Sequence, residues 1–245
     1  MRLPLPCIEC AKQKADPTTG MFSTVSLFVE MEGEHLFRLT CPDGHSSIVG
    51  LQQPRFELLF ESGAMAFLDG YYREAVASFA AALERFHEYW LQATLRQAGV
   101  PPADVASMWK PMARQSERQY GAFLTLHIRE TGKLAKTLPD KWVTFRNDIV
   151  HKGLFPSAQD AHEYGHEVLQ VIAELWEQLE KNSPAGIASL RSEQSQALTS
   201  VGAYPGEILT ILSRAEDLWP KVLALTDELR LLDDRRRGKG GVVVA

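Results

Sequence analysis

The chain of 245 residues is 45% hydrophobic and 23% charged, a composition that is typical of a folded globular protein and excludes extensive disorder. Its formal net charge of −5 argues against non-specific coating of nucleic acid, because such binding needs many Lys and Arg contacts to phosphates. No apolar run of about eighteen residues and no signal-peptide pattern occurs, so we expect a soluble cytoplasmic protein without membrane contact.

The first fifty residues differ from the rest of the chain in composition and in the spacing of their apolar residues. Residues 21–31 are rich in β-branched and aromatic side chains, and four apolar residues alternate there with period two, which predicts a strand. Gly33 marks a turn, and residues 35–40 are expected to return as the second strand of a hairpin. Such a hairpin is too small to be stable alone. The alternating residues are Val25, Leu27, Val29 and Met31.

From residue 54 nearly to the end, apolar residues recur with helical spacing. The pair Asp69-Gly70 ends the first helix, and Ser157 with Asp160 predicts a capped helix start. We expect a linker over 182–186 and a disordered tail carrying a short basic run. That run contains Arg235, Arg236, Arg237 and Lys239. After the first helix, the predicted helices cover residues 71–97, 103–115, 117–131, 140–152, 157–181, 187–199 and 205–233.

All three cysteines lie in the first 41 residues and suggest a metal site. Cys7 and Cys10 form one pair with CxxC spacing, and Cys41 and His45 form a second pair around a Pro-Asp-Gly turn. Two pairs of soft ligands on tight turns suit tetrahedral Zn²⁺, and four protein ligands leave no open position for catalysis. We therefore predict a structural zinc in a module that resembles a zinc ribbon. Three reduced cysteines without metal are the alternative, and His35 is an alternative fourth ligand.

The stretch FRNDIVHKG at residues 145–153 carries the main catalytic hypothesis. On a helix, Asn147 and His151 share a face, and the long side chain of Arg146 can reach the same spot. Gly153 predicts the helix end, where the partial negative charge favours a protonated imidazole on His151. Arginine can bind a phosphate and histidine can transfer protons, so the group suits cleavage of a phosphodiester.

With its preceding helix at Tyr71–Trp90, this stretch resembles the signature of the HEPN superfamily (higher eukaryotes and prokaryotes nucleotide-binding). The resemblance covers roughly residues 54–181. It implies metal-independent endoribonuclease chemistry of the toxin or phage-defence kind, at a composite site formed by a homodimer. Arg146 would stabilise the phosphate, His151 would act as general acid and base, and Asn147 would orient the substrate or the histidine.

The same resemblance implies RNA as substrate and leaves room for an antitoxin or activator protein as partner. Glu84, on the second predicted helix, could face this site. The superfamily also includes catalytically silent members, so an interaction scaffold without chemistry is the alternative function.

The predicted fold is therefore mainly α: a HEPN-like helical bundle with a small N-terminal β-hairpin zinc ribbon. We expect the zinc-ribbon-like module over residues 1–52, the bundle over 53–182, and a C-terminal helical hairpin with a basic tail over 183–245. No phosphate-binding loop, dinucleotide-binding glycine motif or nucleophile elbow occurs.

A second motif, His162-Glu163-Tyr164-Gly165-His166, matches the HExxH pattern of zinc metallopeptidases. Charged neighbours and a glycine within the helix count against that function. The acids that follow lie too close along the same helix to supply a third ligand. We therefore expect His162 and His166 to lie on a solvated helix surface, and we keep the metallopeptidase as a lesser alternative.

Overall fold

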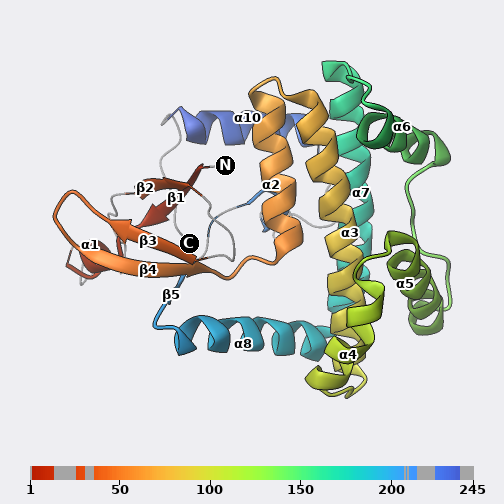
Figure 1. Ribbon diagram of the computed structural model, residues 1–245, viewed down its shortest axis with the longest axis horizontal. Helices are drawn as coiled ribbons and strands as arrows, with labels where there is room; N and C mark the ends of the chain where they lie inside the picture. Colours follow the sequence, from red (N-terminus) through yellow and green to blue (C-terminus); the bar gives the residue numbers. More distant parts are fainter. Residues whose placement is uncertain are drawn as a thin grey trace. The chain divides into compact units, whose positions relative to one another are not determined.

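The computed structural model describes residues 2–13, 26–30, 36–206, 208, 210–213 and 224–237 (Figure 1). These residues form a mainly helical protein with small β-sheets near its N-terminus, which confirms the predicted fold class. Within these ranges, no helix has both the length and the apolar character needed to cross a bilayer.

The chain divides into two compact units, and the first is discontinuous in sequence. Among the described residues, the first unit contains 2–53 and 191–208, and the second contains 54–190 and 210–237. Residues 191–208 therefore belong with the N-terminal residues.

Two sheets and a short helix, α1 (Ile8–Gln13), make up most of the first unit. In the two-stranded sheet, β1 pairs with β2 in antiparallel fashion. In the three-stranded sheet, β4 lies in the middle, antiparallel to β3 and parallel to β5. The strands are β1 (Arg2–Pro6), β2 (Ser26–Glu30), β3 (Leu36–Thr40), β4 (Ser46–Leu51) and β5 (Tyr204–Gly206).

The predicted hairpin between residues 21–31 and 35–40 was wrong in its pairing. Strands β2 and β3 form within those segments, but β2 pairs with β1 and β3 pairs with β4. The sequence did not predict strands β1 and β4, because β1 contains two prolines and β4 contains a glycine, and both residues are unfavourable within strands. Val25, Met31, Gly33 and His35 lie outside the described residues.

Three long helices form the middle of the second unit: α2 (Arg55–Leu68), α3 (Tyr72–Gln97) and α7 (Ala158–Asn182). Helix α3 packs against both others, and their facing sides bury the apolar residues that recur with helical spacing. The rings of Phe56 and Phe86, for example, meet edge to face with centroids 5.0 Å apart. Burial of such apolar surface is the main term that stabilises the bundle.

The remaining helices surround this core. Helices α5 and α6 pack on α3, α4 contacts α3 and α5, and α10 packs on α2 and α7. Helix α8 begins in the second unit and ends in the first. Their bounds are α4 (Pro102–Met112), α5 (Ser116–Thr131), α6 (Asp140–Lys152), α8 (Pro184–Ser200) and α10 (Leu225–Arg236).

The predicted start and stop signals around α6 and α7 are confirmed. Gly153 ends α6 with φ of 73°, a left-handed conformation that glycine adopts without strain. Ser157 caps α7, because its Oγ accepts a hydrogen bond from the backbone N–H of Asp160 at 3.1 Å. Gly153 thus fixes the end of the helix that carries the Arg-Asn-x3-His motif, and Ser157 fixes the start of the next helix.

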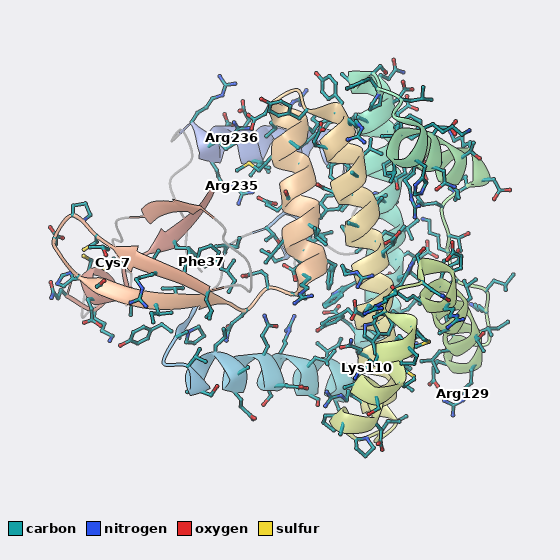
Figure 2. All side chains as sticks on the ribbon, viewed as in Figure 1. Cys7, Phe37, Lys110, Arg129, Arg235 and Arg236 are labelled. Carbon is teal, nitrogen blue, oxygen red and sulfur yellow. The ribbon has the colours of Figure 1, made fainter. Side chains whose placement is uncertain are left out.

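The C-terminal part differs most from expectation. Helix α8 starts inside the predicted linker, residues 204–206 form a strand, and Ala224 is extended, so no helix runs continuously over 205–233. Helix α10 also reaches into the segment that was expected to be disordered. Arg235 lies near Glu61, and Arg236 pairs with Asp69. Both arginines are labelled in Figure 2. These arginines anchor α10, while Lys239 lies outside the described residues.

Candidate metal centre and candidate catalytic site

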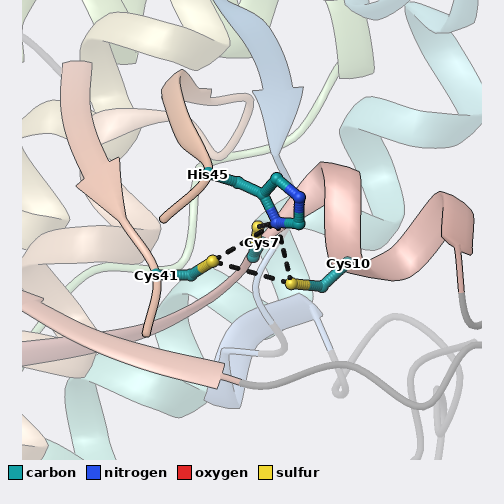
Figure 3. A group of neighbouring side chains, drawn as sticks. All are labelled: Cys7, Cys10, Cys41 and His45. Atoms are coloured by element: carbon teal, nitrogen blue, oxygen red, sulfur yellow. Dashed lines mark hydrogen bonds between the residues drawn. The ribbon is translucent and has the colours of Figure 1, made fainter. Parts of the chain in front are cut away.

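Four potential metal ligands converge in the first unit (Figure 3). Cys7 follows β1 directly, and Cys10 lies in α1. Cys41 and His45 flank the turn between β3 and β4, which is closed by a 3.0 Å hydrogen bond from Cys41 N–H to the His45 carbonyl. Gly44 supplies the left-handed residue that this turn needs, with φ of 83°. The pairs found by spacing thus meet at one point.

Several distances within this cluster are close to those of tetrahedral coordination, and all four ligand atoms lie within 4.8 Å of one another. The Sγ atoms of Cys10 and Cys41 are 3.6 Å apart, and His45 Nδ1 lies 3.3 Å from Cys10 Sγ and 3.5 Å from Cys41 Sγ. Metal–sulfur bonds of ~2.3 Å and metal–nitrogen bonds of ~2.0 Å give tetrahedron edges of about 3.8 and 3.5 Å. The fourth ligand, Cys7, has its Sγ 4.0 Å from His45 Nδ1. The four residues can therefore hold one metal ion.

Polar groups beside the cluster orient its ligands. His45 presents Nδ1 to the thiols, and the side-chain amide of Gln13 lies 3.4 Å from its other nitrogen, Nε2. The Asp43 carboxylate lies 3.4 Å from Cys10 Sγ. Such outer contacts fix the tautomer of a ligating histidine.

The thiols of the cluster differ in acidity. Burial, with contacts to Cys7, Cys41 and Asp43, raises the pKa of the Cys10 thiol to about 12. Burial also disfavours the Cys41 thiolate, but hydrogen bonds from the His45 backbone and the neighbouring thiols outweigh it and lower its pKa to about 7. Metal binding must therefore displace protons, and affinity is expected to rise with pH.

Arg146 lies on the inner side of α6 and is held by two neighbours. Its Nη2 lies 2.7 Å from Glu84 Oε1 on α3, and its Nη1 donates to Asn147 Oδ1 at 3.0 Å. Trp142 and Ile149 are buried on the same helix and fix α6 against the bundle. Glu84 therefore does face the motif.

His151 lies elsewhere on α6, in its last turn, and is exposed. Among the described residues, no hydrogen bond or ion pair joins it to Arg146 or to any other group. Lys152, the next residue, pairs with Asp148 at 2.6 Å. The structure thus brings Arg146 and Asn147 together with Glu84 and leaves His151 open to a partner or substrate at the helix end.

Arg146 and Asn147 also line a cavity of about 330 Å³ enclosed by residues of α3, α5, α6, α7 and the segment before α6. Tyr164 lies in its wall, and burial raises the pKa of its hydroxyl. His87 lines the cavity too, and its neighbours in the sequence are largely apolar. Glu84 and His87 are three apart on an apolar helix, and that spacing was the sequence signal for a polar patch.

The HExxH motif lacks the geometry of a metal site. Tyr164 and Gly165 are buried against the bundle, and His162 Nε2 lies 3.0 Å from the hydroxyl of Thr226. Helix α7 runs unbroken through the motif to Asn182. In the described part of the chain, the cluster of three cysteines and His45 is the one group of three or more potential ligands.

Comparisons with protein-family models, with curated proteins and with solved structures find no match to this chain. The resemblance to the HEPN superfamily thus depends on the Arg-Asn-x3-His stretch and the helix at Tyr71–Trp90.

Proposed function

We propose that the first unit binds one structural Zn²⁺ through Cys7, Cys10, Cys41 and His45. The support is the convergence of three sulfurs and one nitrogen within 4.8 Å of one another, a ligand set that suits zinc. Four protein ligands leave no position for a substrate, so the ion would stabilise the small sheets around it. Purified protein should contain one zinc per chain, and Cys41→Ser should lose it.

We further propose that the second unit is a metal-independent endoribonuclease of the toxin or phage-defence kind. One observation carries this proposal: Arg146, Asn147 and Glu84 meet in the lining of a cavity, while His151 is free at the exposed end of the same helix. An oriented guanidinium can bind a phosphate, and an exposed histidine at a helix C-terminus can transfer protons.

In this reaction the RNA 2′-oxygen attacks the adjacent phosphorus and loses its proton to a base. The bond to the 5′-oxygen breaks, and that oxygen receives a proton, leaving a 2′,3′-cyclic phosphate and a 5′-hydroxyl. Arg146 would stabilise the charge on the phosphate, and His151 would move the protons. Asn147 would orient the substrate or His151. Because one His151 cannot easily serve both oxygens, the proposal includes a homodimer that supplies a second one.

The test is RNA cleavage in EDTA, with bound zinc quantified after the incubation. His151→Ala should abolish cleavage without unfolding the chain, and Arg146→Ala should reduce it strongly. Two matched controls should stay active: His166→Ala on α7, and Arg129→Ala, an exposed arginine on α5 (Figure 2). Cleavage that requires added Mg²⁺, or that survives His151→Ala, contradicts the proposal.

A non-catalytic scaffold is the second candidate, and the ion pair favours it. The guanidinium of Arg146 is already satisfied by Glu84 and Asn147, as expected for a purely structural arginine. In that case Arg146→Ala should lower stability without changing any activity, and overexpression of the protein should not be toxic. Toxicity that Arg146→Ala relieves would favour the enzyme.

A further inference from the structure

The cavity beside Arg146 has the dimensions of a small-ligand site. Its volume of about 330 Å³ lies at the lower end of the range for pockets that hold small molecules. Apolar side chains such as Ala80, Leu138 and Val171 form part of its lining, and polar or charged side chains form the rest. This combination suits a single ring system with a few polar atoms on its edge.

His87 is a polar group in this cavity that nothing in the described chain satisfies. Its side chain is 7% exposed and stacks on Phe123 with ring centroids 4.3 Å apart. No described residue forms a hydrogen bond with its ring nitrogens, although buried polar groups are nearly always paired. Burial lowers its pKa to about 3, so the ring is neutral near pH 7 and offers one donor and one acceptor.

The charges around the cavity disfavour an anion inside it. Glu84 and Glu117 line it together with one cation, Arg146, and His87 is neutral. The net negative charge would therefore repel a phosphate inside the cavity, whereas it would not repel an uncharged planar ring. Tyr120, 36% exposed in the lining, offers an aromatic face on which such a ring can stack.

We propose that this cavity receives one unstacked nucleobase of a single-stranded RNA, next to the phosphate held by Arg146. The inference rests on the proposed ribonuclease function and adds a base-binding pocket to it. Enzymes that act on single strands hold a splayed base by stacking and by hydrogen bonds to its edge. The base would fill the apolar space, and its phosphate would stay at the Arg146 edge.

The test measures binding and not cleavage, so that it is independent of catalysis. Full-length His151→Ala protein is titrated by fluorescence anisotropy with labelled hexamers of adenosine, cytidine or uridine, and with a hexamer of abasic ribose phosphates. All four have the same charge, so contacts to phosphate contribute equally. We expect at least one base-bearing hexamer to bind on the order of tenfold more tightly than the abasic one.

Two further variants test the location of the pocket. Ala80→Leu adds three carbons inside the cavity and should remove this advantage, whereas Ala81→Leu, on the same helix outside the lining, should keep it. Circular dichroism confirms that both are folded. Equal binding of abasic and base-bearing hexamers, absence of binding, or an unchanged advantage in Ala80→Leu overturns the inference.

The two proposals fail separately. Base-dependent binding that Ala80→Leu removes, without cleavage by the wild-type protein, would reject the ribonuclease and keep the pocket. Cleavage by the wild-type protein with no dependence of binding on the bases would keep the ribonuclease and reject the pocket.

Discussion

Replacement of His45 by alanine tests the metal centre most directly. His45 supplies the single nitrogen of the cluster, and its Nδ1 lies 3.3–4.0 Å from the three sulfurs. Structural zinc sites contribute about 10–16 kcal/mol of binding free energy, which is about 3 kcal/mol for each of four ligands. His45→Ala should therefore weaken zinc binding on the order of a hundredfold or more.

Competition with a chromophoric chelator gives the zinc dissociation constant of each variant. Gln13→Ala is the matched control, because Gln13 contacts His45 Nε2 at 3.4 Å without being a ligand. Loss of such an outer contact costs about tenfold to a hundredfold. Hydrogen exchange should show faster opening of β3 and β4 in His45→Ala, with the amides of α3 unchanged. A dissociation constant within threefold of the wild-type value would exclude His45 as a ligand and refute the tetrahedral geometry.

Three further predictions concern the helical unit. The folded pKa of His87, about 3, lies below its ordinary value of 6.5, so stability is full above pH 6.5 and falls between pH 6.5 and 3. Urea unfolding should show a loss of about 2 kcal/mol between pH 7 and 5 from this group, and His87→Phe should lack it. Gly165→Ala places a Cβ 2.6 Å from the Phe79 ring and should lower the stability of the protein by about 1–3 kcal/mol. Gly121→Ala meets no atom within 4 Å and should stabilise α5 by up to about 1 kcal/mol. A higher melting temperature for Gly165→Ala, or a lower one for Gly121→Ala, would contradict this. Gln97→Ala removes the acceptor for the first two N–H groups of α8 and should cost about 1 kcal/mol; an unchanged midpoint in urea would show that water replaces it.

Local signals in the sequence predicted most of the helical unit. The bounds of α6 agree with prediction because Gly153 ends it with a left-handed residue and Ser157 starts the next helix. The proximity of Cys41 and His45 was also predictable, because a short turn joins them and their spacing in the sequence indicates that turn. In each case the residues that determine the structure are neighbours in sequence.

Features that depend on distant residues could not be predicted in this way. Glu84 was expected to face the site, but the sequence did not predict its ion pair with Arg146, 62 positions away. Strand β5 contains Pro205 and only three residues, so neither its propensity nor its length distinguishes it from a loop. Residues 204–206 form a strand because they pair in parallel with the edge of β4 and bond its backbone groups.

The parallel pairing of β4 with β5 has a consequence for biosynthesis. Leu51 pairs with Gly206, and Gln53 Nε2 donates to the Ile208 carbonyl, so the metal-binding unit is completed by residues made 155 positions later. At a translation rate of about 5–20 residues per second, β4 waits roughly 8–30 s on the ribosome for its partner. During that interval the edge of β4 is open while helices α2 to α7 of the second unit emerge. Metal binding by the cysteine cluster can therefore precede completion of the sheet, and would hold β3 and β4 in register until β5 arrives.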